Sequence, residues 1–368
     1  MMRKFFRGLM LAVDILAGLC LVVSAYAGTV SPLRFGGSWG IIGLTFPLVL
    51  LLVVLLLIIQ LFWHRRGALV LAIFMVICGG PILTYCPLNI HFGEREPAPG
   101  DSTFTVLSYN VANLIDQRPA GSYDSSYNAM VSYILHRDAD IVCLSESKRL
   151  GISERLHITP AQYDSLARRY PYIIISGTAQ ATLSKFPLQP IHLALDRETF
   201  GAGDVGLYRV TLPGGRLMTL ANVHLQSLSL QPRDKDLYMD LTELRTEDLE
   251  SVKSQLLKKI AAANIMRARQ TQILLGVIRH YGGPNVIVCG DFNDIPDCYS
   301  IRTFEDAGFR SVYPEIGFGP IITFNANRFY FCIDHVLYRG KLKPLSIDKG
   351  TTMASDHYPL FTRFEITE

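Results

Sequence analysis

Three long apolar segments in the first ninety residues constrain the fold of this chain more than any other feature. They cover residues 5–27, 39–63 and 68–90. Each reaches the roughly 20 residues that a helix needs to cross a lipid bilayer. Asp14 lies inside the first segment, and because a charge in a bilayer is costly, it is expected to face a neighbouring helix. We therefore predict an anchor of three transmembrane helices over residues 1–92.

The first apolar segment also fits a cleaved signal peptide. Basic residues precede it, and the small residues Ala25 and Ala27 lie near its end. The two further apolar segments favour a retained anchor over a cleaved leader.

The basic residues predict the orientation of this anchor. Arg3, Lys4 and Arg7 precede the first segment, and Arg65 and Arg66 follow the second. Short cytoplasmic loops carry an excess of Lys and Arg, so these ends are expected in the cytoplasm. The chain after the third segment then lies on the extracytoplasmic side of a cell (cytoplasmic or inner) membrane. The lipid bilayer is the expected partner of the anchor, and no protein partner is inferred.

A second domain is expected after a short linker. The stretch from Pro97 to Asp101 contains two prolines and a glycine, which predicts a linker over residues 93–102. Residues 103–368 are long enough for one large domain.

Charge and cysteine content exclude some classes of function. The formal net charge of +3 gives no overall basic field for nucleic acid. The seven cysteines show no CxxC spacing, which argues against a zinc knuckle or a redox motif. Cys298 and Cys332 are the only plausible disulfide candidates, and free thiols are the expected state.

A β-α-β unit opens the second domain. An alternating strand over residues 103–109 ends in Asn110, residues 123–137 have helical spacing, and the apolar strand 140–145 ends in Glu146. Because such units place their strands parallel, Asn110 and Glu146 are expected at the same edge of one sheet.

Further polar residues occur at or near the ends of other apolar strands. They are Asp291 and Asn293 after the strand 286–289, His224 after the hairpin 206–212 and 216–223, Asp334 within the strand 331–338, and Asp356 and His357 before the last strand, 360–364. Each alone is more often a turn residue, a helix cap or a solvated side chain. Their recurrence on separate strands favours one shared site.

Carboxylates and carboxamides together suit a hard cation that prefers oxygen ligands. Mg²⁺ keeps several waters and takes only one or two protein carboxylates. Glu146 is the best single ligand, with Asn110 or Asp356 assisting. Zinc is disfavoured, because no histidine pair or thiolate stands at ligand spacing.

The remaining polar residues suit attack of water on a phosphate. His357 and His224 can donate to phosphate oxygens as charge develops. Asp334 can hold His357 in the required tautomer. Asp291 can orient or deprotonate the attacking water, and Asn293 can fix the phosphate or Asp291.

The ordered set of motifs resembles the endonuclease/exonuclease/phosphatase superfamily, which is DNase I-like. The motifs are Ser108-Tyr109-Asn110-Val111, Leu144-Ser145-Glu146, Leu183-Ser184-Lys185-Phe186-Pro187, Asn222-Val223-His224-Leu225, Gly290-Asp291-Phe292-Asn293-Asp294, Ile333-Asp334-His335-Val336 and Ser355-Asp356-His357-Tyr358-Pro359. The resemblance covers residues 103–367. It implies a four-layer α/β sandwich, dependence on Mg²⁺ or Mn²⁺, and in-line attack of water on a phosphoester.

The resemblance also implies a role for each site residue. The family's metal-ligand glutamate falls on Glu146, its first-strand asparagine on Asn110 and a further metal-side carboxylate on Asp356. Its water-activating aspartate falls on Asp291 and its phosphate-contacting asparagine on Asn293. The paired aspartate and histidine fall on Asp334 and His357, and the mid-domain histidine on His224.

The chain departs from the family in two places. Ser145 stands where many members have Gln, which affects the hydrogen bonding beside Glu146 but spares the ligand. The polar insertion over residues 227–250 has no general counterpart, and either a lid or an inert loop fits it.

Three hypotheses for function follow. The first is a membrane-anchored, metal-dependent phosphoesterase that hydrolyses a phosphodiester (nucleic acid or phospholipid) or a phosphomonoester. The second is a catalytically silent binding or scaffold module on the same fold, which would be expected to have lost Glu146, Asp291 or His357. The third, a small transporter, is disfavoured because the apolar segments show no ion path.

Overall fold

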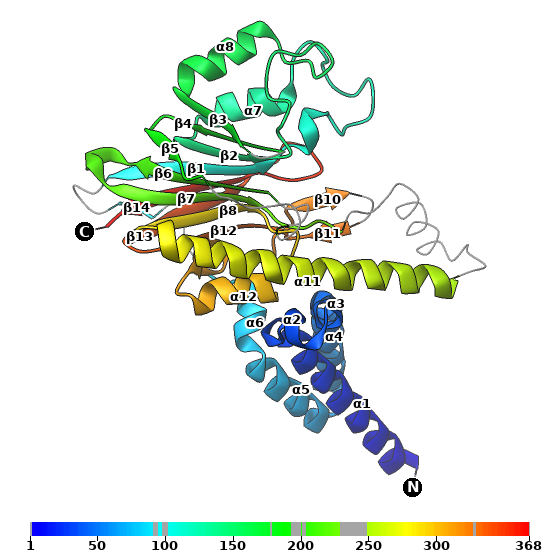
Figure 1. Cartoon of the computed structure of the whole chain (residues 1–368). Helices are drawn as coiled ribbons and strands as arrows, with labels where there is room; N and C mark the ends of the chain where they lie inside the picture. The colour runs from blue at the N-terminus through cyan, green and yellow to red at the C-terminus, as the bar shows by residue number, and fades with distance from the viewer. Residues whose placement is uncertain are drawn as a thin grey trace.

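The computed structural model describes residues 2–90, 95–97, 102–176, 179–192, 200, 204–228, 249–326 and 329–367. A bundle of N-terminal helices lies below a larger domain built on two β-sheets (Figure 1). We call these parts the helical unit and the sheet domain. The helical unit contains α1 (Met2–Ala25), η1 (Ala27–Thr29), α2 (Pro32–Phe35), α3 (Ser38–Leu44), α4 (Phe46–Trp63), α5 (Arg65–Ile77) and α6 (Gly79–Tyr85).

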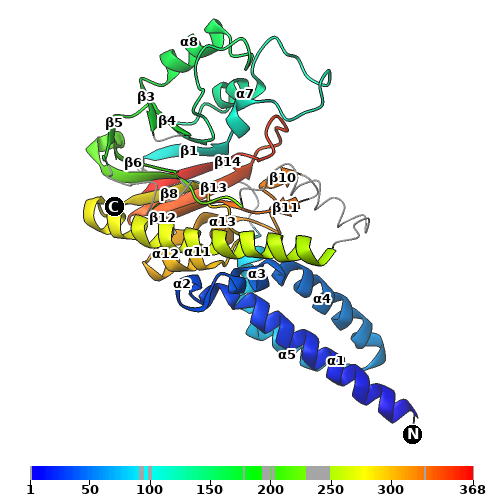
Figure 2. The ribbon, with the colours of Figure 1, turned by 45° about the vertical axis from the view of Figure 1, so that its right-hand side comes forward.

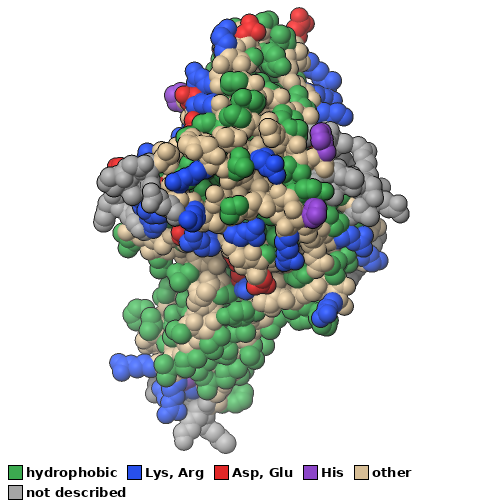
Figure 3. All heavy atoms as spheres, turned by 60° about the vertical axis from the view of Figure 1, so that its left-hand side comes forward, with side chains coloured by type: hydrophobic (Ala, Val, Ile, Leu, Met, Phe, Trp, Pro, Cys, Tyr) green, Lys and Arg blue, Asp and Glu red, His purple; other side chains and the backbone are tan. Residues whose placement is uncertain are grey.

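Two helices of this unit are long and apolar enough to cross a membrane. The spans are Phe5–Thr29 and Phe46–Trp63, and α5 with α6 adds a third only if this pair, bent by 71°, counts as one span. Side chains exposed on the unit are mostly hydrophobic, as the face in Figure 3 shows. The prediction of apolar helices is therefore confirmed, with a count of two or three.

The boundaries of two predicted spans differ from the structure. The second span begins at Phe46, because Pro47 occupies the first turn of α4 and the chain before it forms the separate helix α3. The third span bends at Gly79, Gly80 and Pro81, which weaken a continuous helix.

The buried charge of the first span is paired within the unit. Both oxygens of the Asp14 carboxylate accept hydrogen bonds from the Gln60 amide of α4, at 3.0 and 2.8 Å. Both side chains are almost fully buried. The expectation that Asp14 faces a neighbouring helix is confirmed.

The sheet domain contains two six-stranded sheets. The first has the order β13-β14-β1-β2-β4-β3, from β1 (Thr103–Asn110), β2 (Ile141–Ser145), β3 (Tyr172–Ser176), β4 (Gln180–Ser184), β13 (Leu342–Lys349) and β14 (Leu360–Ile366). The second has the order β5-β6-β7-β8-β12-β9, from β5 (Leu188–Pro190), β6 (Asp204–Thr211), β7 (Leu217–His224), β8 (Val286–Asp291), β9 (Arg310–Ser311) and β12 (Asp334–Arg339). A separate hairpin pairs β10 (Phe324–Ala326) with β11 (Phe329–Phe331).

Helices cover the outer face of each sheet. Those on the first sheet are α7 (Ala129–Arg137) and α8 (Pro160–Arg169), and those on the second are α11 (Leu249–Tyr281) and α12 (Tyr299–Asp306); η2 (Ala112–Leu114), η3 (Pro213–Gly215) and α13 (Val312–Ile316) lie in connections. Alternate residues of a strand point to opposite faces, so Ile287 packs between the sheets while Val288 packs under α11. The predicted four-layer α/β sandwich is confirmed.

Some predicted elements have other ends. The predicted helix 123–137 begins only at Ala129, where the Asn128 side chain caps it by accepting the Val131 N–H at 3.0 Å. The predicted strand 331–338 divides into β11 and β12. Its main chain leaves the ladder because the N–H groups of Ile333 and Asp334 donate to Thr323 Oγ1.

Cys298 and Cys332 are free thiols, as expected.

The helical unit packs against the second sheet's outer layer (Figure 2). The Asn264 side chain of α11 donates to the Gly37 carbonyl, before α3, at 2.8 Å. A Cβ at Gly28 would lie 2.0 Å from the Asp297 carbonyl oxygen, so only glycine permits this close approach. Most of the insertion over residues 227–250 lies outside the described residues.

We predict that Gln60→Leu lowers the free energy of unfolding of the full-length protein in detergent by about 1–3 kcal/mol, because the Asp14 carboxylate loses its buried donors. The double variant Asp14→Leu/Gln60→Leu removes both polar groups and should recover most of this loss. Thermal unfolding followed by circular dichroism measures both effects. A double variant less stable than Gln60→Leu would contradict the pairing.

Candidate active site

The structure brings all eight candidate residues together at one edge of the sandwich. Six of them line a cavity of about 330 Å³: Glu146, His224, Asp291, Asn293, Asp356 and His357. The other two, Asn110 and Asp334, are hydrogen-bonded to members of this set. Strand register explains the meeting, because the parallel pair β7 and β8 places His224 opposite Asp291, and the antiparallel pair β8 and β12 places Asp334 opposite Asp291.

Asn110 joins carboxylates from the two sheets. Its Nδ2 donates to Glu146 Oε1 at 3.2 Å and to Asp291 Oδ2 at 3.0 Å. Glu146 follows β2 with a positive φ of 53°, a strained conformation for a residue with a Cβ. This turn directs the carboxylate toward the cavity, where about a third of the side chain is exposed.

Asn113 is a site residue that sequence reasoning missed. Its Nδ2 donates to Glu146 Oε2 at 3.1 Å, and its φ is 59°. The available signal was its place three residues after Asn110. That spacing matches no strand or helix rule, because η2 between them is irregular.

A tight turn after β8 positions Asp291 and Asn293. Gly290 has a φ of 142°, and a Cβ there would lie 1.9 Å from the Val223 carbonyl oxygen. The Asn293 N–H donates to Asp291 Oδ1 at 2.8 Å, and its side-chain amide donates to the Leu225 carbonyl at 3.0 Å. The loop therefore fixes one oxygen of the Asp291 carboxylate and is itself held against the residue that follows β7.

His357 and Asp334 form a buried pair. His357 Nδ1 lies 2.8 Å from Asp334 Oδ2, and the other ring nitrogen, Nε2, lies 3.6 Å from Asp291 Oδ2. The Ser355 hydroxyl accepts the His357 N–H at 3.2 Å and donates to the Asn110 carbonyl at 2.7 Å. Ser355 thus ties the segment before the last strand, β14, to the end of the first strand, β1.

The two carboxylates control the charge of this histidine. Burial opposes the protonated imidazole, but the negative charges of Asp334 and Asp291 outweigh it and raise the pKa of His357 to about 10. Burial also raises the pKa of the Asp334 carboxyl, and attraction to His357 opposes that rise. We take His357 to be a cation at neutral pH, because it lies between two buried carboxylates.

The remaining histidine and aspartate face the same cavity. His224 Nε2 lies 3.9 Å from Glu146 Oε1 and 3.8 Å from Asp291 Oδ2. Asp356 lines the cavity, and the Ser355 hydroxyl lies 3.4 Å from its carboxylate.

The cavity lining is strongly acidic. Glu146, Asp291, Asp294 and Asp356 contribute carboxylates. Among the lining residues that the structure describes, Arg267 is the only Lys or Arg; it is 2% exposed and its Nε lies 3.3 Å from Asp294 Oδ2. An anionic phosphate would be repelled by this lining unless a cation offset the charge.

Two sets of residues can hold such a cation. The side-chain atoms of Asp291, Asp334 and His357 lie within 4.8 Å of one another, and all three are buried. However, Asp334 already bonds His357, and burial leaves this set little room for metal-bound water. Glu146 is open to the cavity, which fits a Mg²⁺ ion that keeps several waters.

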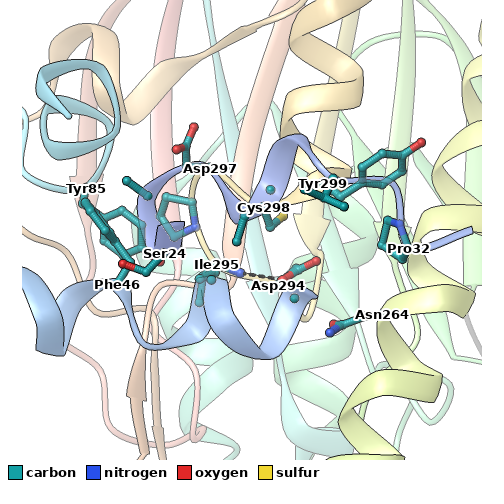
Figure 4. Close-up of a pocket in the computed structure, with 17 residues that line it drawn as sticks. Ser24, Pro32, Phe46, Tyr85, Asn264, Asp294, Ile295, Asp297, Cys298 and Tyr299 are labelled. Atoms are coloured by element: carbon teal, nitrogen blue, oxygen red, sulfur yellow. Dashed lines mark hydrogen bonds between the residues drawn. The ribbon is translucent and has the colours of Figure 1, made fainter. Parts of the chain in front are cut away.

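A second, much smaller cavity lies between the helical unit and the sheet domain (Figure 4). Ser24, Phe46 and Tyr85 of the helical unit line one part of it, and Asp294 and Cys298 line it from the chain after β8. Its volume of about 20 Å³ is only slightly larger than the roughly 10–15 Å³ that one water molecule requires. It is a packing seam that brings the helical unit against the loop following Asp291.

Comparison with known families now identifies the sheet domain. Residues 107–357 match the Endonuclease/Exonuclease/phosphatase family. The chain belongs to this family. Residues 3–85 match a Domain of unknown function (DUF8431), and no curated protein matches the chain.

Several solved structures resemble this member of the family at low identity. An endonuclease/exonuclease/phosphatase from Beutenbergia cavernae DSM 12333 is 14% identical over 72% of each chain, with a TM-score of 0.44. The human Nocturnin catalytic domain with bound sulfate is 17% identical over 74% of this chain and 99% of that chain, with a TM-score of 0.47. TDP2 from D. rerio, complexed with a single-strand DNA product, is 16% identical over 72% of this chain and 99% of that chain, with a TM-score of 0.44.

We predict that Asp334→Asn lowers the pKa of His357 by about 1–3 units, because an adjacent negative charge is removed while burial remains. A histidine with a pKa near 10 stays protonated at pH 8, whereas the variant should lose this proton as pH rises. Nitrogen-15 NMR of the imidazole in metal-free, full-length protein measures the titration. The exposed Asp306→Asn provides the control, and an unchanged His357 titration in Asp334→Asn would refute the coupling.

Proposed function

We propose that this protein is a membrane-anchored, divalent-metal-dependent phosphoesterase that hydrolyses a phosphodiester or phosphomonoester by in-line attack of water. One observation carries the proposal. The side chains of Asp334, His357 and Asp291 contact one another in that order, beside Glu146 and an acidic cavity. Such a cavity combines a fixed base, a buried cation and a ligand for a metal.

Each catalytic residue has a specific task in this proposal. Asp291, held by Asn110 and the Asn293 N–H, orients the attacking water and accepts its proton. His357, kept cationic by Asp334, donates to a phosphate oxygen from Nε2. His224 lies beside Glu146, from where it can donate to the phosphate. Asn293 fixes Asp291 through its N–H.

The donor set fits a hard cation. Glu146 would hold Mg²⁺ or Mn²⁺, with Asn110 and Asp356 assisting, and Asn113 orients the second Glu146 oxygen. When bound, the ion supplies positive charge that neutralises and polarises the phosphate. Zinc fits less well, because no thiolate is among the described residues that line the cavity and His357 Nδ1 is already paired with Asp334.

The helical unit supports the membrane part of the proposal. The N-terminus lies at the end of the unit far from the sheet domain (Figure 2). His64 separates α4 from α5, and Arg65 and Arg66 are the first residues of α5. With positive charges inside, the sheet domain lies on the extracytoplasmic side of a cytoplasmic or inner membrane. We propose an anchor over residues 1–92, a linker over residues 93–102 and a catalytic domain over residues 103–368.

The complete polar set supports an enzyme over a silent binding or scaffold module. Glu146, Asp291 and His357 are all present and face one cavity. A silent module would have no need to keep buried carboxylates close together, because their repulsion costs stability.

We predict that Asp291→Asn and His357→Ala each lower turnover by at least about 100-fold, because each removes a group that moves or stabilises charge in the transition state. The full-length protein in detergent is offered a soluble phosphodiester, a phosphomonoester, DNA and sphingomyelin, with Mg²⁺ and with EDTA. The exposed Asp306→Asn is the matched control. Folded wild-type protein that hydrolyses none of these substrates would favour the silent binding module.

We predict that Glu146→Gln weakens Mg²⁺ binding at least about ten-fold, since the variant keeps the shape of the side chain but loses the charge that holds a hard cation. Isothermal titration calorimetry with Mg²⁺ or Mn²⁺ measures the affinity without reference to turnover. The exposed Glu154→Gln should bind as the wild type does. Unchanged affinity in Glu146→Gln would place the ion at Asp291, Asp334 and His357 instead.

A further inference from the structure

The cavity of the candidate active site has two chemically different walls. One wall carries the carboxylates and histidines described above. The other is apolar and consists of Leu44, Leu228, Ile260, Ile295, Phe324, Phe331 and Ile333. A site that only had to hold water, a metal and a phosphate would not need this second wall, because all three are polar.

The apolar wall begins at the histidine of the site. The Phe324 ring centroid lies 4.9 Å from that of the His357 ring, with the planes inclined by 60°. Phe324 also forms a β-bridge with His357 and pairs with Phe331 across the β10–β11 hairpin. A group attached to a phosphate bound at His357 would therefore lie next to the apolar side chain of Phe324.

The other end of the apolar wall belongs to the helical unit. Leu44 is the last residue of α3, and α4, which is long and apolar enough to span a membrane, begins at Phe46. The Asn264–Gly37 hydrogen bond holds the chain before α3 against α11, which contributes Ile260 to the same wall. The cavity lining therefore includes a residue two positions before the start of a proposed membrane span.

The surface next to Leu44 is suited to contact with lipid. Leu48 and Leu51, in the first turns of α4, are 71% and 57% exposed. Exposed leucines of this kind are expected where a helix faces a bilayer. The apolar wall thus continues from the phosphate-binding region to the level at which α4 would enter the membrane.

Charge argues against a nucleic acid in this cavity. A protein that binds a polynucleotide uses several Lys and Arg side chains to neutralise successive phosphates. Among the described lining residues, Arg267 is the only such side chain, and it is buried and paired with Asp294. The lining suits one phosphate with a cation, not a row of phosphates.

We propose that the substrate is an amphiphilic phosphoester of the lipid bilayer. Its phosphate binds beside His357, and its hydrocarbon chain lies along the wall from Phe324 to Leu44. The water oxygen bonds to phosphorus as the ester P–O bond breaks, and one water proton goes to Asp291. The leaving alkoxide takes a proton from solvent water to become an alcohol, and Asp291 then releases its proton to solvent. This inference rests on the proposed phosphoesterase function and adds the class of substrate.

The test uses two phosphodiesters that differ only in chain length. Methyl 4-nitrophenyl phosphate and hexadecyl 4-nitrophenyl phosphate release the same nitrophenolate, so one absorbance measurement follows both. Full-length protein in mixed micelles with Mg²⁺ should show a kcat/KM at least about 100-fold higher for the hexadecyl ester, because each buried methylene favours binding. A single-stranded oligonucleotide is offered in parallel.

The variant Leu44→Ser tests the wall itself. The ratio of kcat/KM for the hexadecyl ester to that for the methyl ester should fall about ten-fold, as expected when a hydrophobic contact to a substrate is lost. The ratio is internal to each protein sample, so partial misfolding does not change it. Leu61→Ser, an exposed position at the other end of α4 and outside the cavity, is the matched control and should keep the wild-type ratio.

The outcomes separate this inference from the proposed function. Equal kcat/KM values for the two esters, an unchanged ratio in Leu44→Ser, or preference for the oligonucleotide would overturn the lipid substrate and leave the phosphoesterase intact. Failure to hydrolyse either ester, the oligonucleotide or a soluble phosphomonoester in the presence of Mg²⁺ would overturn both.

Discussion

The position of the Asp291 carboxylate determines how the rest of the site is arranged. It ends the central strand β8, between β7, which carries His224, and β12, which begins with Asp334. Asn110 reaches it from the other sheet at 3.0 Å. Because the two sheets pack face to face, this contact helps to fix the distance between the polar groups of both. The stability of the sandwich therefore also maintains the geometry of the site.

Concentrating negative charge in this way has a cost that the surrounding residues offset. Asn110, Asn113 and the Asn293 N–H donate to the carboxylates, and the pKa of His357 is raised so that the imidazole adds a positive charge. Arg267 pairs with Asp294 and also donates to the Gln226 carbonyl at 3.0 Å. In the proposed function, these bonds hold the cavity ready for a cation and a phosphate without closing it.

Much of this arrangement was predictable from local pattern. Apolar runs that end in a polar residue predicted the strands before Asn110, Glu146, His224 and Asp291, and the parallel pairing of β1 and β2 confirmed the common edge predicted for Asn110 and Glu146. The predictions failed where nonlocal bonds decide the chain's course. Thr323 separates β11 from β12, and Asn113 enters the site through an irregular turn that has no periodicity.

The sequence by itself determined the apolar helices, the α/β layers and the residue types of the site, because hydrophobic periodicity and strand-end polarity are local properties. Only the tertiary structure decided what these parts contact. It placed Gln60 against Asp14, Asp334 against His357, and Leu44 of the helical unit in the wall of the cavity. Such contacts join residues far apart in the chain, and they depend on how the layers and helices pack, which no local pattern records.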